Sequence, residues 1–207
     1  MTVHFTSDNH WFHKNIMKYS NRPFTSVEDM TQKMIKLWNK RVNPEDTVYH
    51  LGDFAFGRIE KIEELLKQLN GRKRFINGNH DAELIGKGKD RFQIYSDQNY
   101  NAIYKNSLRL LRAGLIESIR DYEEVTVNNQ FIVLFHFGGR VWQKSHHGAW
   151  QLFGHSHSSL PPFGKSVDVG VDSTWITGKA EYRPFSFYEI KAFMDKQETI
   201  KVDHHGD

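Results

Sequence analysis

The stretch Arg74-Phe75-Ile76-Asn77-Gly78-Asn79-His80-Asp81 joins a short apolar run to a polar turn. The apolar run is typical of the end of a buried strand, and Gly78 permits a tight turn directly after it. The turn carries an amide, an imidazole and a carboxylate within three residues. In α/β proteins, binding sites lie at the carboxyl ends of strands. The stretch therefore predicts a strand, a turn and a functional site in direct succession.

Four other segments repeat this pattern, in which an apolar run ends in side chains that can bind a metal ion or a proton. The first stretch contributes Asn79 and His80. The side chains at all five strand ends are Asp8, His10, Asp53, Asn79, His80, His136, His155 and His157. Turns at the carboxyl edge of neighbouring strands converge on one region. We therefore expect these groups to meet at a single site.

Hydrophobic periodicity predicts alternating strands and helices in the first half of the chain. The expected strands cover 3–7, 46–51 and 72–76, and the expected helices cover 13–20, 26–42 and 58–70. Ser26 is the predicted N-cap of the second helix, and Gly71 is predicted to end the third. This alternation favours a parallel sheet.

The second half is richer in strands. Asn128-Asn129-Gln130, between apolar runs at 125–127 and 131–135, predicts a hairpin. Further strands are expected at 151–153, 167–171 and 185–190, and a helix at 101–112. We expect one domain over residues 1–195, followed by a polar C-terminal tail at 196–207.

Composition narrows the classes of function. At 207 residues the chain suits one well-buried domain. The absence of cysteine excludes thiol catalysis, disulfides and Cys-type zinc sites. The formal net charge of +3 allows a phosphate-bearing partner without requiring one. No run approaches the roughly 20 apolar residues of a membrane span, and no signal segment is recognisable at the start, so we expect a cytoplasmic protein with no membrane partner.

Carboxylates, several imidazoles and one amide together suit a two-metal centre. Mixed imidazole and carboxylate ligands fit Mn²⁺, Fe and Zn²⁺. One aspartate can bridge two ions about 3.5–4 Å apart, and such a pair can support in-line attack on phosphorus. The strand-end residues therefore predict a dinuclear centre that acts on phosphoesters.

Five motifs resemble, in their order along the chain, those of the calcineurin-like metallophosphoesterases. They are Asp-x-His, Gly-Asp, Gly-Asn-His-Asp, His and Gly-His-x-His. They span Asp8 to His157, and residues 47–57 look similar to the small phosphoesterases of bacteria and their phages. The resemblance implies an α/β fold. In this family the fold is a four-layer αββα sandwich, with two facing mixed β-sheets flanked by helices.

The resemblance also implies roles for individual residues. The first metal would lie at Asp8, His10 and His157, the second at Asn79, His136 and His155, and Asp53 would bridge the two. His80 would stabilise the transition state and protonate the leaving oxygen, because an imidazole titrates near neutral pH. Two divalent ions are implied, with Mn²⁺ the first candidate and Fe, Zn²⁺ and Ni²⁺ the others. Metal-bound hydroxide would attack the phosphoester in line.

One departure from the family's protein-phosphatase branch is informative. That branch extends Gly-Asp to Gly-Asp-x-x-Asp-Arg-Gly, whereas here Gly52-Asp53 is followed by Phe54-Ala55-Phe56-Gly57-Arg58. It also places a Glu where this chain has Asp81, for which we expect the role of a helix N-cap rather than a catalytic group. A protein phosphatase is therefore disfavoured. A phosphodiesterase on a nucleotide-type substrate is preferred, because small members that lack this extension often act on diesters.

Substrate contacts are harder to assign. Arg140, His146 and His147 are candidates to contact substrate phosphate, although a solvated loop is the alternative for the two histidines. In the segment 87–112, basic residues at positions 87, 89, 91, 105, 109 and 112 alternate with aromatic ones. This segment either binds nucleic acid or packs over the sheet. A nuclease or nucleic-acid end-processing phosphatase thus remains an alternative. So does an inactive metal-binding scaffold for protein interactions.

Overall fold

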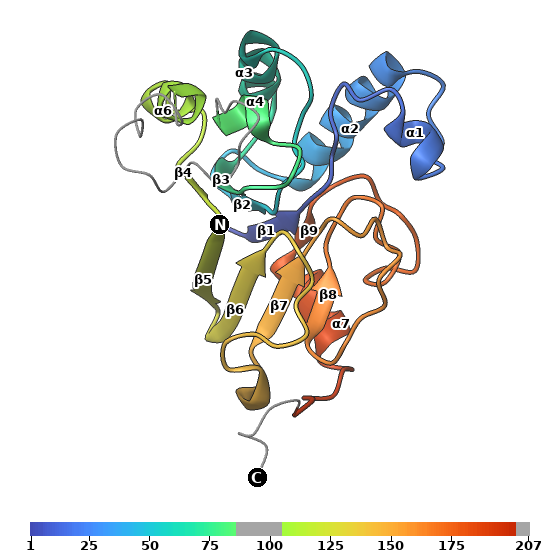
Figure 1. Ribbon diagram of the computed structural model, residues 1–207, viewed down its shortest axis with the longest axis vertical. Helices are drawn as coiled ribbons and strands as arrows, with labels where there is room; N and C mark the ends of the chain where they lie inside the picture. The colour runs from blue at the N-terminus through green and yellow to red at the C-terminus, as the bar shows by residue number, and fades with distance from the viewer. Residues whose placement is uncertain (86–104, 202–207) are drawn as a thin grey trace.

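The computed structural model describes residues 1–85 and 105–201 (Figure 1). One sheet contains β1 (Val3–Thr6), β2 (Thr47–His50), β3 (Arg72–Ile76), β4 (Ser118–Arg120) and β9 (Phe185–Ser186). The other contains β5 (Tyr122–Val127), β6 (Gln130–Phe135), β7 (Trp150–Phe153) and β8 (Ser166–Asp168). The helices are α1 (Ile16–Tyr19), α2 (Val27–Arg41), α3 (Ile59–Gln68), α4 (Ala82–Ile85), α6 (Lys105–Arg112), α7 (Phe187–Met194) and the 3₁₀ helix η2 (Ser145–His147).

Both sheets are mixed. The five-stranded sheet has the order β4-β3-β2-β1-β9, in which β1 to β4 are parallel and β9 is antiparallel to β1. In the four-stranded sheet, of order β5-β6-β7-β8, the β5–β6 pair is an antiparallel hairpin, and β6, β7 and β8 are parallel. The predicted parallel sheet in the first half and the predicted hairpin are therefore confirmed.

The two sheets lie face to face. Figure 1 shows α2, α3, α4 and α6 above the five-stranded sheet and the four-stranded sheet below it. Val48 and Phe75 point to the helical side, where they pack with Trp38 of α2 and Ile62 of α3. The opposite face buries Phe5, Tyr49 and Leu51 against Ile132, Leu134 and Leu152 of the other sheet. The expected α/β fold with two facing mixed sheets is confirmed.

Helix boundaries follow local signals in the sequence. The Ser26 hydroxyl accepts a hydrogen bond from the Asp29 N–H at 3.1 Å, which caps α2 as predicted. Gly71 has a φ of +89°, and a Cβ there would lie 2.7 Å from Val42, so only glycine fits after α3. Within residues 1–85 and 105–201, no helix is long and apolar enough to cross a membrane.

The expected strand over 185–190 is wrong beyond Ser186. Ser186 caps α7, and with Glu189 it forms a capping box in which each side chain bonds the other residue's backbone N–H. Phe187, Ile190 and Met194 of α7 then pack into the core between the sheets. On the outer face of the four-stranded sheet, Val133 packs with Trp142 and Ala149 from the segment between β6 and β7.

Glu189 also ties α7 to the rest of the fold, which makes the stability of the protein depend on pH. Burial opposes its ionisation, but hydrogen bonds from Arg183 and Ser186 outweigh that cost and lower the pKa of Glu189 from 4.5 to about 2. A lowered carboxyl pKa contributes stability above pH 4.5 and loses it as the pH falls toward 2.

We expect the free energy of unfolding in urea to fall across this window. The fall should be shallower in Glu189→Gln, which removes the ionisable group. Urea unfolding followed by circular dichroism at a series of pH values measures the fall in the wild type and in the variant. An unchanged pH dependence in the variant would exclude this role for Glu189, and Asp195→Gln, a substitution of an exposed carboxylate on α7's C-terminal side, is the control.

Candidate metal centre

The strand-end residues come together because their strands end at one edge of each sheet. The turns after β1, β2 and β3 of the first sheet face those after β6 and β7 of the second. Backbone hydrogen bonds tie these turns to one another: the Asp8 N–H donates to the Gly52 carbonyl and the Gly154 N–H to the His136 carbonyl, each at 3.0 Å. All seven predicted metal ligands lie in or next to these turns.

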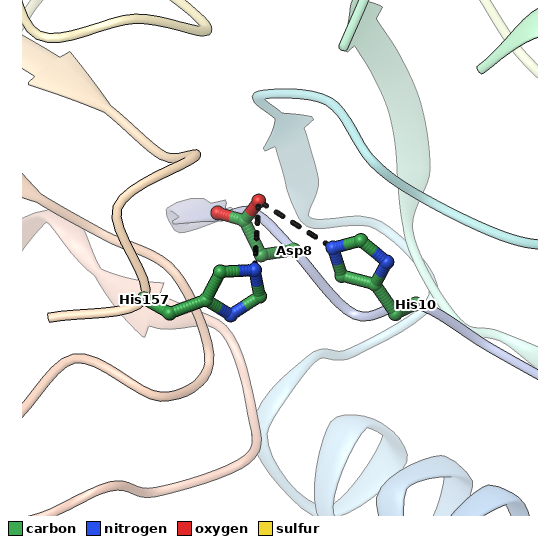
Figure 2. A group of neighbouring side chains, drawn as sticks. All are labelled: Asp8, His10 and His157. Carbon is green, nitrogen blue, oxygen red and sulfur yellow. Dashed lines mark ion pairs between the residues drawn. The ribbon is translucent and has the colours of Figure 1, made fainter. Parts of the chain in front are cut away.

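Asp8, His10 and His157 form the first group of possible ligands (Figure 2). The Asp8 Oδ1 atom lies 3.9 Å from Nε2 of His10 and 4.0 Å from Nε2 of His157. One ligand atom from each of the three residues lies within 4.8 Å of the others. Asp8 and His10 are buried, whereas the His157 side chain is 23% exposed and so leaves the group open on one side.

Asp53, His136 and His155 form the second group. The Asn79 amide oxygen joins them, at 3.0 Å from both His136 Nε2 and His155 Nδ1. His136 Nε2 also lies 3.6 Å from Asp53 Oδ1. The other ring nitrogen of His136, Nδ1, lies 2.7 Å from the Leu51 carbonyl, so Nδ1 carries the hydrogen and Nε2 is the nitrogen whose lone pair can bind a metal.

Asp53 lies between the two groups and turns one carboxylate oxygen to each. Its Oδ2 is 3.5 Å from His10 Nε2 in the first group, and its Oδ1 is 3.6 Å from His136 Nε2 in the second. A carboxylate placed in this way can contact two ions at once.

The residues present fit divalent cations. Asp8 Oδ1 and both ring nitrogens of His10 are buried, and none has a hydrogen-bond partner among the residues that the structure describes. Such atoms are costly to leave unpaired. Their separations of 3.5–4.0 Å are too long for hydrogen bonds. Ligand atoms about 2.1 Å from a shared ion lie about 3–3.5 Å apart, which is close to this spacing.

The electrostatics of the protein alone disfavour charge at this site. Burial raises the pKa of Asp8 well above its ordinary value, and the neighbouring Asp168 and Asp53 add to the shift. Burial also raises the pKa of Asp53 and lowers that of His10. The protein therefore gathers carboxylates whose ionisation is opposed by burial and an imidazole held neutral, which is the form that binds metal.

The backbone turns sharply to point these side chains inward. Five of the seven predicted ligands have a positive φ: Asp8 (56°), His10 (50°), Asp53 (57°), His155 (67°) and His157 (46°). This left-handed region is uncommon for residues other than glycine. Each such residue costs of order 1–3 kcal/mol, and this strain persists where the surrounding structure enforces it.

Asp81 holds two of these turns together. The structure places it directly before α4, where an N-cap was expected, but its carboxylate accepts hydrogen bonds from other turns. Oδ2 accepts from the N–H groups of Asp53 and Gly78, and Oδ1 accepts from the N–H of Phe54, at 2.7–2.8 Å. Asp81 is fully buried. It thus fixes the turn that carries Asp53 against the turn that carries Asn79 and His80.

A second buried network supports His157. The Asp172 Oδ2 atom lies 2.7 Å from His157 Nδ1, and the Arg22 guanidinium binds both oxygens of Asp172, at 2.9 and 2.8 Å. Arg22 also donates to the backbone carbonyls of Asp8 and Asn9, at 2.6 and 2.7 Å. The hydrogen bond to Asp172 orients the ring so that Nε2 faces Asp8.

Sequence reasoning missed Arg22, Asp168 and Asp172 as supports of the site. Asp168 accepts hydrogen bonds from the N–H groups of Ser158 and Gly170 and from the Ser156 hydroxyl, so it holds the turn between His155 and His157. No signal in the sequence pointed to the two aspartates. Both alternate with valines in residues 167–172, and such alternation predicts polar side chains on the solvent face, so the burial of these two carboxylates could be seen only in the structure.

Asp172→Asn is expected to weaken Mn²⁺ binding about 10–100-fold, because the amide orients the His157 ring less firmly. Calorimetric titration of the metal-free protein measures the change. Asp195→Asn removes a surface carboxylate that pairs with Lys191, and it serves as the matched control. Metal affinity at the wild-type level in Asp172→Asn would refute the role of this network.

His80 lies beside both groups. Its ring centroid is 5.6 Å from that of His10 and 5.5 Å from that of Phe56. The backbone N–H of His80 donates a hydrogen bond to Asp53 Oδ1 at 2.8 Å. Its side chain lines an open cavity of about 460 Å³ together with those of His13, Tyr19 and His157. His13 thus faces this cavity while it stacks on Phe56.

The remaining predicted residues lie in different places. Arg140 lies on the loop after β6, close to His136 in sequence. His146 and His147 belong to η2, which precedes β7, whereas His155 follows β7, so the structure does not bring these two histidines to the cluster. The basic residues at 87–91 lie outside the described residues. Arg109 of α6 forms ion pairs with Glu60 and Glu63 of α3, so this end of the 87–112 segment packs against a neighbouring helix.

Comparisons with known proteins agree with this picture. The family model of the calcineurin-like phosphoesterases matches residues 1–162. An uncharacterized protein of Methanocaldococcus jannaschii is 42% identical over 209 residues, which cover 97% of this chain and 95% of that protein. The Gene 66 protein of Mycobacterium phage L5 is 27% identical over 184 residues, 82% of this chain and 86% of that one. The crystal structure of a protein of unknown function from Aquifex aeolicus shares the fold, with a TM-score of 0.60, 22% identity and coverage of 92% and 98%.

Proposed function

Because this chain belongs to the calcineurin-like phosphoesterase family, which hydrolyses phosphoric esters, we propose that it is a phosphodiesterase with a dinuclear metal centre and a nucleotide-type substrate. The observation that carries the proposal is the position of Asp53, which turns one oxygen to His10 and the other to His136. A single carboxylate between two separate groups of ligands supports a centre of two ions rather than one.

The two ions would be held by the residues already described. Asp8, His10 and His157 would hold one ion, and Asn79, His136 and His155 would hold the other, with Asp53 shared. Mn²⁺ is the first candidate, because oxygen and imidazole ligands suit it. When bound, two such ions lower the pKa of water and draw charge away from the phosphoryl oxygens.

The protein's own contribution is to orient these ligands and to move a proton. His80 lies at the edge of the centre with its backbone fixed by Asp53, and its imidazole faces the open cavity. As the bond from phosphorus to the leaving oxygen breaks, His80 donates its proton to that oxygen. Imidazole suits this role, since it exchanges a proton near neutral pH.

A diester is favoured over a monoester because there is room for organic groups on two sides. The cavity that contains His80 lies on one side. A second cavity, lined by Gly138, Arg140 and Phe153 among others, lies on the segments that follow His136 and precede His155. A monoester has one organic group, whereas a diester has two. Phe56 and Arg58, which replace the protein-phosphatase extension, also argue against phosphoprotein substrates.

The test is hydrolysis of bis(4-nitrophenyl) phosphate and of 4-nitrophenyl phosphate, with Mn²⁺, Ni²⁺, Zn²⁺ or Mg²⁺ and with a chelated control. We expect hydrolysis that depends on metal and a higher kcat/KM for the diester. Bound metal, measured by elemental analysis, should reach two ions per chain in the wild type and fewer in Asp53→Asn.

Each alternative predicts a different result. Preference for the monoester would indicate a nucleotide phosphatase or a nucleic-acid end-processing enzyme. Wild-type activity and full metal content in Asp53→Asn would exclude the bridging role. No hydrolysis of either ester, in protein that holds two ions, would favour the interaction scaffold.

A further inference from the structure

The second cavity, of about 310 Å³, opens on the outer side of the four-stranded sheet near the ends of β6 and β7. Its walls are mostly apolar, with Phe153, Leu160, Pro161, Pro162 and Phe163 beside the polar Arg140 and Ser166. One cation stands at this cavity: the Arg140 guanidinium lies over the Phe163 ring, 4.4 Å from its centroid. The residues of this cavity have no role in holding the proposed metals.

The cavity is next to the candidate metal centre along two separate segments of chain. Gly138 follows His136 by two residues, and Phe153 precedes His155 by two, so each pair of Cα atoms is at most about 7 Å apart. Phe137 also lies against the ring of His155, at 4.7 Å between centroids. The cavity therefore begins within two residues of two of the candidate ligands.

The cavity is kept open and held in shape by two features. A Cβ at Gly138 would lie 2.8 Å from Leu160 and 3.1 Å from the Phe153 ring, so glycine leaves space where these walls meet. The buried side chain of Gln151 accepts hydrogen bonds through Oε1 from the Gly139 N–H, at 3.0 Å, and from the Ser166 hydroxyl, at 2.8 Å. These bonds preorganise the loop that carries Arg140.

From this geometry we infer that the cavity is a subsite for the planar base of the nucleotide-type substrate, on the part of the diester that stays bonded to phosphorus. The inference rests on the proposed phosphodiesterase function. The volume of the cavity is at the low end of the roughly 300–1,000 Å³ of small-molecule pockets, which suits one ring system rather than a polymer. An aromatic wall and a guanidinium stack well on a heteroaromatic ring, whereas an alkyl chain would gain nothing from the cation.

The test uses three diesters that share the leaving group 4-nitrophenolate and differ only in the retained group: methyl, hexyl or 5′-thymidyl. With a common leaving group, differences in kcat/KM report on binding of the retained group. Stacking of one base on an aromatic side chain predicts about a 5- to 150-fold preference for the thymidyl ester over the methyl ester. The hexyl ester should gain less.

Arg140→Met and Phe163→Leu keep apolar bulk and remove the cation and the ring, respectively. Each is expected to lower the ratio of kcat/KM for the thymidyl and methyl esters about tenfold, because one stacking partner is lost. Tyr188→Leu, a change at an exposed aromatic residue on α7, is the matched control and should leave the ratio unaltered.

The outcomes separate this inference from the function on which it rests. If none of the three diesters is hydrolysed with any metal, the proposed phosphodiesterase function fails. If all are hydrolysed but the thymidyl ester has no advantage over the methyl ester, or the variants leave its advantage intact, the subsite is refuted. An equal advantage for the hexyl ester would show a general apolar pocket and would also overturn the assignment of a base.

Discussion

Replacing His80 with alanine is expected to lower kcat for a diester with an alkoxide leaving group by about 10²–10⁴-fold, the usual contribution of a positioned general acid. The side chain lies beside both ligand groups, but it is not needed to complete either of them. Metal content should therefore remain at the wild-type level. Steady-state rates, with bound metal measured in the same samples, test both parts of this prediction.

The dependence on the leaving group makes the test specific for proton donation. 4-Nitrophenolate leaves without protonation, so His80→Ala should impair nitrophenyl esters much less than a dinucleotide, whose leaving alkoxide needs a proton. An equal loss for both kinds of ester would indicate a role in binding or charge stabilisation instead.

His147→Ala is the matched control for this experiment. This exposed histidine lies in η2 before β7, away from the cluster, so its removal should not change either rate. A His80→Ala protein that cleaves the dinucleotide at the wild-type rate would rule out His80 as the acid.

Asp81→Ala is expected to cause the largest loss of stability. It removes the acceptor of three backbone N–H groups, those of Asp53, Phe54 and Gly78. Each buried donor left without a partner costs about 1–3 kcal/mol, so the free energy of unfolding should fall by at least about 3 kcal/mol. This is a large part of the roughly 5–15 kcal/mol that stabilises a typical domain. Urea denaturation followed by circular dichroism measures it.

Asp81→Asn keeps the shape of the side chain and one carbonyl oxygen, so its loss of stability should be intermediate. This variant remains informative if the alanine variant does not fold. Because the turn that carries Asp53 is then less well held, its Mn²⁺ affinity should also fall. Asp195→Ala, at an exposed carboxylate, controls for the loss of charge. A stability within about 0.5 kcal/mol of wild type for Asp81→Ala, the range typical of surface substitutions, would contradict the proposed role.

Much of the fold could be predicted from local patterns. The stripe of apolar residues in α2 and α3, the cap at Ser26 and the hairpin at Asn128-Asn129 are signals within a few residues, and the structure agrees with each. The failure at 187–190 was also local. The composition of Phe187-Tyr188-Glu189-Ile190 suits a strand. The capping box formed by Ser186 and Glu189 instead stabilises the start of a helix.

The strand-end residues could be found in the sequence for a related reason. A parallel sheet places the ends of its strands at one edge. The position in the fold of a polar residue directly after an apolar run can therefore be predicted from the sequence. Asp8, Asp53 and His136 are of this kind, and the structure brings them together. The same rule says nothing of His146 and His147, whose position before β7 places them away from the cluster.

The sequence by itself therefore determined most of the strands, most of the helices and the set of residues at the strand ends, because each of these depends on neighbours in the chain. Only the tertiary structure decided how those residues are held. Arg22 and Asp172, which form an ion pair, are 150 positions apart in the sequence. Asp81 lies 28 positions after Asp53, from whose backbone N–H it accepts a hydrogen bond. The cavity that contains Arg140 is lined by residues of separate loops. Such contacts have no local pattern, since they arise where independently formed elements meet in the folded chain.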